Sequence, residues 1–282
     1  MTAHPTAGLG LKPQHFAEAA ACPTVGSQAG LWFEVHPENY MVPGGPRLAW
    51  LERVRAARPL SLHGVGLSIA GDERPDQTHL KRFRTLIDRF DPFLISEHLA
   101  WSRRDSVYHP DLLPIPRNRE MLTLVCDHLD EAQTALGRPL LLENPTAYLP
   151  LAGHDWDEVD FLTEISRRTG CGLLVDVNNV YLSARNMGLS AEDWLDRVPA
   201  DLIGEIHLAG HRPDPVWGEA LLIDSHDAPV SEAVWSLYAR LVYRTGPRPT
   251  LVERDAEVPP FGELLREQAR ASDILTKRVL AA

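Results

Sequence analysis

Cysteine is scarce in this sequence. There are three in 282 residues, Cys22, Cys126 and Cys171, and they lie far apart. An odd number of distant cysteines indicates neither a disulfide framework nor a CxxC site. We therefore expect a protein of the reducing cytoplasm whose chemistry is carried by other residue types.

Long apolar runs and a recognisable export signal are also missing. No segment approaches the roughly 20 consecutive apolar residues needed to cross a bilayer. The N-terminal stretch MTAHPTAGLGLKPQHF has no basic segment followed by an apolar one. The sequence therefore predicts neither a membrane partner nor secretion.

Positive charge is in deficit, with 28 Lys and Arg against 39 Asp and Glu and a formal net charge of −11. Nucleic-acid binding favours a basic surface, so nucleic acid is not expected as a partner. The glycines of GVGLS and GGP are not followed by Lys-Ser/Thr, and there is no GxGxxG. A nucleotide cofactor is therefore not expected either.

What the sequence does contain is a recurring apolar run followed by a turn and, in most cases, an amphipathic stretch. The runs span residues 8–11, 31–35, 60–63, 93–97, 140–143, 173–177, 203–207 and 250–253. Helical patterns span residues 46–57, 78–90, 117–136, 156–168, 231–244 and 261–279. Continuous apolar strands that alternate with helices are typical of a parallel sheet buried on both faces. Eight such runs predict an α/β fold, a (β/α)8 TIM barrel that forms a single domain over residues 1–282.

Polar and ionisable residues follow these runs, at the end of a barrel where catalytic groups sit. They are His63, Glu97, His98, Glu143, Asn144, Asp176, Asn179, His207, His211 and Glu253, with Asp224 and His226 in the loop after the seventh run. A lone strand-end His or Asp more often bonds backbone or caps a helix than binds a metal. Burying so many carboxylates together, however, costs on the order of several kcal/mol for each uncompensated charge. The pattern therefore predicts a bound metal cluster.

The residue types narrow the choice of metal only partly. No cysteine stands among these residues, which argues against iron–sulfur chemistry and thiolate-bound zinc. A set of His and carboxylate ligands suits zinc, manganese or non-haem iron, and the residue types do not separate these three.

The ordered motifs resemble two families of barrel enzymes. The order His, His, Glu, Asp-x-x-(His/Asn), His, Asp-x-His, Glu is similar to the trinuclear zinc site of endonuclease IV-type enzymes. The motifs themselves more closely resemble the multinuclear non-haem iron-dependent oxidative enzymes, which include the methanobactin biosynthesis oxidase and the enzymes that modify bufferin-type peptides. The matching stretches are GLGLKPQHF (8–16), WFEVHPENYMVPGGP (32–46), LSLHGVGLSI (60–69), ISEHLAW (95–101), LLLENP (140–145), VDVNNVYLSARN (175–186), GEIHLAGH (204–211), DSHDAPV (224–230) and LVERD (251–255).

The resemblance implies a ligand set in three parts. These are His63 and His98 with Glu143 as a bridge; Asp176, His207 and Glu253; and Asn179, Asp224 and His226. Among them, Glu143, Asp176, His207 and Glu253 would be the catalytic ligands. Asn179 stands where the endonuclease has His, and a neutral amide is a poorer ligand. We therefore expect the third position to bind its metal more weakly.

The resemblance also implies the reaction. The cofactor would be a cluster of about two to three iron ions in mixed Fe(II)/Fe(III) valence. O2 would be the co-substrate, and the target would be cysteine residues of a ribosomally synthesised precursor peptide, recognised with the help of a companion protein. Nothing in the sequence identifies the peptide or that companion.

Further residues could line the pocket or orient a ligand. Four residues in or just after the second run either line the pocket or organise the turn before residues 43–46. They are Glu34, His36, Glu38 and Asn39. Asn144, His211 and Arg254 are candidates for contacts to substrate or to a ligand. Asn178 is expected to point away from the metals.

Three alternative functions remain open on the sequence. One is a zinc phosphodiesterase of the endonuclease IV type. Another is a sugar isomerase-like barrel that uses manganese or magnesium. The third is a metal-binding partner of another biosynthetic protein with no activity of its own.

Overall fold

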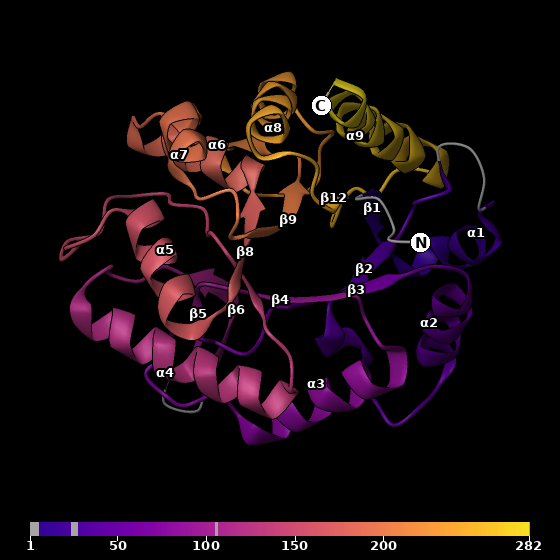
Figure 1. Ribbon diagram of the computed structural model, residues 1–282, viewed down its shortest axis with the longest axis horizontal. Coiled ribbons are helices and arrows are strands. Elements are labelled where there is room, and N and C mark those ends of the chain that lie inside the picture. The colour runs from indigo at the N-terminus through magenta and orange to yellow at the C-terminus, as the bar shows by residue number, and fades with distance from the viewer. Residues whose placement is uncertain (1–5, 24–27, 105–106, 282) are drawn as a thin grey trace.

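The computed structural model describes residues 6–23, 28–104 and 107–281. Within these residues eight parallel strands close into a barrel in the order β1-β12-β9-β8-β7-β4-β3-β2 (Figure 1). The strands are β1 (Ala7–Gly10), β2 (Phe33–Val35), β3 (Leu60–Gly64), β4 (Leu94–His98), β7 (Leu141–Glu143), β8 (Gly172–Asp176), β9 (Ile203–Leu208) and β12 (Thr250–Val252). The predicted TIM barrel is confirmed, and each predicted apolar run contributes one of these strands.

The helices surround the barrel, and α9 packs against β1 and β12, where the barrel closes. They are α1 (Phe16–Ala21), α2 (Pro46–Ala57), α3 (Gln77–Phe90), α4 (Arg119–Leu136), α5 (Glu158–Thr169), α6 (Val177–Met187), α7 (Ala191–Arg197), α8 (Glu232–Thr245) and α9 (Phe261–Ala281). Local chemistry sets several of these bounds. The Asn118 side chain accepts from the backbone N–H of Met121 at the start of α4, and Gly137 ends that helix with a φ of 67°. Within the described residues no helix is long and apolar enough to cross a membrane.

Elements outside the barrel were not predicted from the sequence. Among the described residues, two hairpins stand apart from the closed sheet: β5 (Trp101–Arg104) with β6 (Val107–Leu113), and β10 (Arg212–Asp214) with β11 (Gly218–Ile223). Short 3-10 helices at Pro13–His15 and Pro37–Tyr40 follow β1 and β2.

The strand register brings the polar strand ends to one level. His98 on β4 pairs with Glu143 on β7, and Asp176 on β8 pairs with His207 on β9. Because parallel strands all end at the same rim of the barrel, these side chains converge without any long loop to carry them.

A glycine on β1 tests the packing of the barrel wall. A Cβ built on Gly8 would lie 2.4 Å from the indole of Trp32, which is buried at 2% exposure. We expect Gly8→Ala to lower the free energy of unfolding by about 1–3 kcal/mol through overpacking, as measured by urea denaturation. The control is Gly262→Ala on α9, where an added Cβ meets nothing within 4 Å. Equal unfolding midpoints for the two variants would contradict this account of the barrel wall.

Candidate metal centre

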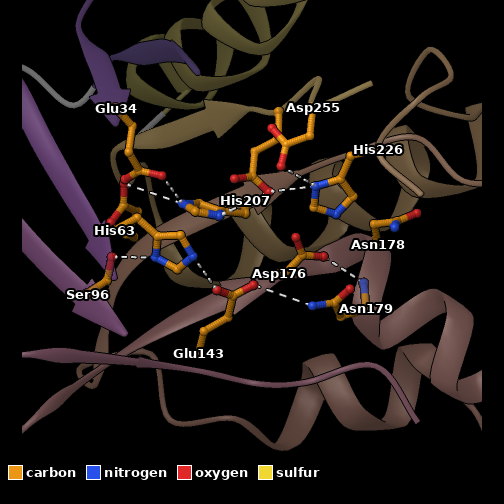
Figure 2. Close-up of polar contacts among 12 residues, drawn as sticks. Glu34, His63, Ser96, Glu143, Asp176, Asn178, Asn179, His207, His226 and Asp255 are labelled. Carbon is orange, nitrogen blue, oxygen red and sulfur yellow. Dashed lines mark hydrogen bonds and ion pairs between the residues drawn. The ribbon is translucent and has the colours of Figure 1, made fainter. Parts of the chain in front are cut away.

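The first cluster at the barrel mouth joins His63, His98 and Glu143. The Nε2 atoms of the two imidazoles lie 3.1 and 3.2 Å from the same oxygen, Oε2 of Glu143, and 3.2 Å from each other (Figure 2 shows His63 and Glu143). Each ring is fixed through its other nitrogen. Nδ1 of His63 bonds the Ser96 hydroxyl at 2.8 Å, and Nδ1 of His98 bonds the Gly64 carbonyl at 3.0 Å. The ring orientations therefore direct three potential ligand atoms to one point.

The second cluster joins Glu143, Asp176 and His207, whose ligand atoms all lie within 4.8 Å of one another. Asp176 is fully buried, and its Oδ1 accepts the backbone N–H of Asn179 at 2.6 Å. Its Oδ2 has no hydrogen-bond partner within the described residues. Glu143 thus belongs to both clusters, as a bridging ligand would.

A third cluster joins Asp176, His226 and Glu253. Nδ1 of His226 lies 3.4 Å from Glu253 Oε2, and its Nε2 lies 2.8 Å from Asp224 Oδ1. Asp255 also faces Nδ1, with its Oδ2 at 3.6 Å (Figure 2). The structure therefore brings Asp224 and His226 from their loop to the strand ends, as the sequence predicts.

The loop that carries His226 is held in a strained conformation. His226 has a φ of 49°, in the left-handed region that non-glycine residues rarely adopt. Its backbone N–H donates to the Gly210 carbonyl at 3.1 Å, and its carbonyl accepts from Asp255 N at 2.9 Å. A Cβ on Gly210 would lie 1.8 Å from the Ala228 carbonyl oxygen. Surrounding backbone contacts thus impose the conformation that aims His226 at the site.

Asn179 lies at the site as a hydrogen-bonding residue. Its amide nitrogen is 3.4 Å from Glu143 Oε1 and 3.1 Å from the Asn144 carbonyl, and its amide oxygen accepts the Thr146 hydroxyl at 2.5 Å. A role for Asn179 as a metal ligand remains a prediction. Asn144 joins β7 to β8 by bonding both backbone polar groups of Asp176, at 2.9 and 3.1 Å.

Asn178 does not point away from the cluster, contrary to expectation. Its amide nitrogen donates to Asp224 Oδ1 at 2.9 Å, and its oxygen contacts His211 Nδ1 at 2.8 Å. The expectation placed only Asp176 and Asn179 inward across the strand end, but α6 begins at Val177, directly after β8. Successive side chains of a helix are about 100° apart, so Asn178 is not turned to the face opposite Asn179.

The candidate pocket residues have diverse contacts. Glu34 is buried, its Oε1 lies 3.4 Å from His207 Nε2, and its Oε2 accepts the Ser61 hydroxyl at 2.8 Å. His36 lines the pocket above the clusters, whereas Asn39 lines a neighbouring cavity of about 120 Å³.

Other strand-end residues support the structure around the site. Arg254 turns toward α9, where it donates to Glu267 at 2.9 Å. Glu97 accepts the backbone N–H groups of Leu67 and His98 at 3.1 and 3.0 Å, which fixes the end of β4. His211 contacts the Asn178 side chain at 2.8 Å, and its ring lies beside that of Tyr181.

Sequence reasoning missed Glu205. It lies on β9, fully buried, with its Oε1 3.7 Å from His207 Nε2. Burial, followed by the charge of Glu34, raises the pKa of Glu205 to about 7. The pattern GEIH could have indicated this residue, because residues 205 and 207 of a strand face the same side.

The electrostatics of these clusters fit a bound cation. Burial and the Glu143 charge raise the pKa of Asp176 well above its usual value. Burial alone would raise the pKa of Glu143, but the imidazoles of His98 and His63 lower it to about 2. The buried polar atoms that have no hydrogen-bond partner in the described residues include atoms of Glu34, Glu143, Asp176, Glu205, His207 and His226. Carboxylate oxygens and imidazole nitrogens are the donors that zinc, manganese and non-haem iron accept, so the residues present fit such a metal.

A pocket of about 250 Å³ opens above the clusters, lined in part by His63, His98, Glu143 and His226. It adjoins an apolar groove of about 470 Å³ between β6, the loop after β7, and helices α6 and α7. Leu112, Pro145, Thr146 and Tyr148 line both spaces. The polar pocket and the apolar groove therefore lie next to each other.

Comparison with known proteins finds a matching family model and relatives of similar length. The family model for "RiPP precursor modification enzyme MbnB/TglH/ChrH" matches residues 6–276. A UPF0276 protein of Caulobacter vibrioides is 60% identical over 271 residues, which cover 96% of this chain and 95% of that protein. A UPF0276 protein of Bordetella pertussis is 50% identical over 277 residues, which cover 98% and 94%.

Solved structures share the barrel at low sequence identity. An L-ribulose 3-epimerase aligns with a TM-score of 0.63 and 12% identity, over 98% of this chain and 96% of that one. A xylose isomerase-like TIM barrel protein from Mycobacterium smegmatis, solved in complex with magnesium, aligns with a TM-score of 0.62 and 11% identity, over 98% and 97%. At these identities the likeness establishes the fold alone.

The raised histidine pKa values predict that metal uptake releases protons. Burial would lower the pKa of His98, but Glu143 and Glu97 raise it to about 9. At pH 7 this imidazole is protonated in the metal-free protein, whereas a metal takes the neutral ring. Affinity for Zn²⁺ should therefore rise as the pH increases from 7 to 9. In calorimetry at pH 7, the heat of Zn²⁺ binding should depend on the ionisation enthalpy of the buffer. This dependence should be weaker in His98→Gln. Heats independent of the buffer would contradict this protonation state.

Proposed function

The chain belongs to the MbnB/TglH/ChrH family of RiPP precursor modification enzymes, and on that premise we propose that it is an iron-dependent oxidase. Its substrates would be O2 and the cysteine residues of a ribosomally synthesised precursor peptide. The cofactor would be a cluster of two or three irons in mixed valence, held by the residues that the sequence singles out.

The sharing of Glu143 between two adjacent clusters is the observation that carries this proposal. A bridging carboxylate would hold two metal positions side by side, so that both metals could supply electrons to one oxidation. His63, His98 and Glu143 would hold the first iron, and Asp176, His207 and Glu253 would complete the second with Glu143. Asp224 and His226 would hold a third, with Asn179 beside it.

When bound, iron would supply redox electrons and an open coordination position for O2 and a thiolate. The chain's own residues prepare that site. Ser96 and the Gly64 carbonyl keep the two imidazoles aimed at one point. The residues of the first cluster also line the 250 Å³ pocket, so a thiol that enters it would meet their open side. Their near-complete burial limits access of bulk water to this face of the cluster.

The apolar groove supports a peptide substrate over a sugar. A sugar would be served by the polar pocket alone, whereas a peptide also has apolar side chains to place beside the reacting residue. The side chains of Leu112 and Tyr148 stand at the junction of the two spaces and are 38% and 40% exposed. A companion protein that presents the peptide remains part of the proposal, on the strength of the sequence resemblance.

The zinc phosphodiesterase and the sugar isomerase alternatives use similar ligands, so the metal separates them from an oxidase. We expect protein purified without oxygen to contain about two to three iron equivalents per chain by elemental analysis. Co-expression with a small cysteine-rich peptide in air should change the mass of that peptide. Two or more equivalents of zinc with no iron, or an unmodified peptide beside iron-loaded protein, would count against the proposal.

Two ligand variants test how the clusters divide the metals. Glu143→Gln should lower the content of two metal positions at once, because it removes a charge that both share. His226→Ala should remove chiefly the third metal. Glu158→Gln is the control, because Glu158 is a partly buried carboxylate that bonds Trp194 and belongs to none of the clusters. Equal loss of all metal in His226→Ala, measured by elemental analysis, would show that the clusters do not divide in this way.

A further inference from the structure

Glu205 is a buried carboxylate that the proposed ligand set does not use. It lies on β9 two residues before His207, so it faces the barrel interior one layer below the metal ligands. Its exposure is 0%, and neither carboxylate oxygen has a hydrogen-bond partner within the described residues. An ionisable group in such a place is strongly unfavourable unless a neighbour compensates it.

The compensating neighbour is one edge of the His207 ring. Nε2 of His207 lies 3.4 Å from Glu34 Oε1 and 3.7 Å from Glu205 Oε1. The Ser61 hydroxyl holds the other oxygen of Glu34 at 2.8 Å, so that carboxylate is fixed from its far side. Two carboxylates therefore flank the same imidazole nitrogen, and all of these groups are buried.

The opposite edge of the ring faces the metal ligands. Nδ1 of His207 lies 3.4 Å from Oε2 of Glu253, which also belongs to the cluster with Asp176 and His226. A neutral imidazole carries its proton on one nitrogen and offers a lone pair on the other. With carboxylates at Nε2, the proton belongs there, and Nδ1 is the nitrogen that remains for a metal.

We infer that Glu205 is a positioning residue for His207: its carboxylate and that of Glu34 keep the imidazole proton on Nε2 and so present Nδ1 to the metal centre. The inference rests on the metal centre of the proposed function but not on its reaction. A carboxylate behind a ligating histidine fixes the ring and makes it a stronger donor. The competing arrangement uses Glu34, His207 and Glu253 as a cation site of their own, with Glu205 as a direct ligand.

Cobalt(II) alone is the probe, because its visible absorption reports both binding and ligand geometry without any catalytic turnover. The full-length protein is stripped of metal and titrated with cobalt(II), in parallel with Glu205→Gln and Glu205→Leu. The control is Gln268→Leu, which removes another buried polar side chain, one that bonds the Ala7 carbonyl far from the ligands. Thermal unfolding of each metal-free variant checks that it is folded.

We expect Glu205→Leu to weaken cobalt(II) binding by about 10- to 100-fold and to shift the absorption bands, with the number of bound ions at saturation unchanged. The affinity and absorption bands of Glu205→Gln should change less, because its amide oxygen can still face the Nε2–H. If Glu205→Leu does not fold, Glu205→Gln decides the question: its absorption bands should shift while the number of bound ions stays the same. Gln268→Leu should bind as the parent does.

Three results would overturn the inference. Loss of one bound ion at saturation in Glu205→Gln would make Glu205 a ligand rather than a positioning residue. Affinity and spectrum unchanged from the parent in both Glu205 variants would leave it without a role at the metal. A parent protein that binds no cobalt(II) would overturn the metal centre and this inference with it. An inactive but cobalt-binding protein would instead count only against the oxidase.

Discussion

Mutual repulsion among buried carboxylates is the constraint on which the rest of this structure depends. Glu34, Glu143, Asp176, Glu205 and Glu253 are each at most 5% exposed, and parallel strands that end at one rim cannot keep such side chains apart. The protein compensates only in part, with four histidines whose rings lie between the acids. Several of these side chains, among them Glu34, Glu143, Asp176 and Glu205, still have buried oxygens without a hydrogen-bond partner in the described residues. Such a cluster fits the bound cation that we propose.

The same constraint explains how the rings are held. His63 and His98 both bind the scaffold through Nδ1 and turn Nε2 to Glu143. His207 has the opposite orientation, with carboxylates of the barrel interior at Nε2 and the ligand Glu253 at Nδ1. In each case one ring nitrogen is engaged by the barrel wall, which leaves the other for the mouth. Even the strained backbone of His226 serves this purpose, because its φ of 49° is imposed by bonds to Gly210 and Asp255.

The barrel could be predicted from the sequence because its strands are continuous apolar runs that end in polar residues. Such a pattern can be recognised without knowing which residues contact one another in the fold. The β5–β6 hairpin escaped because β6 is largely exposed and contributes no apolar run. Asn178 was misplaced because α6 starts without a turn after β8. Glu205 was not predicted as a site residue because it lies inside a strand rather than at its end. Asn178 and Glu205 also interact with residues distant in sequence, Asp224 and Glu34, and periodicity does not report such contacts.

Sugar epimerases and this family share a barrel, so the barrel cannot be what separates their substrates. What can differ are the hairpins and loops at the rim of the barrel. Here the β5–β6 hairpin and the loop after β7 contribute Leu112, Pro145 and Tyr148, the side chains that join the polar pocket to the apolar groove. Most of the proposed metal ligands come from the strand ends, with Asp224 and His226 from a loop, and the side chains that line both spaces come from elements between the strands. Substrate choice can therefore change through the rim while the buried charges, and the ion proposed to neutralise them, stay as the strands place them.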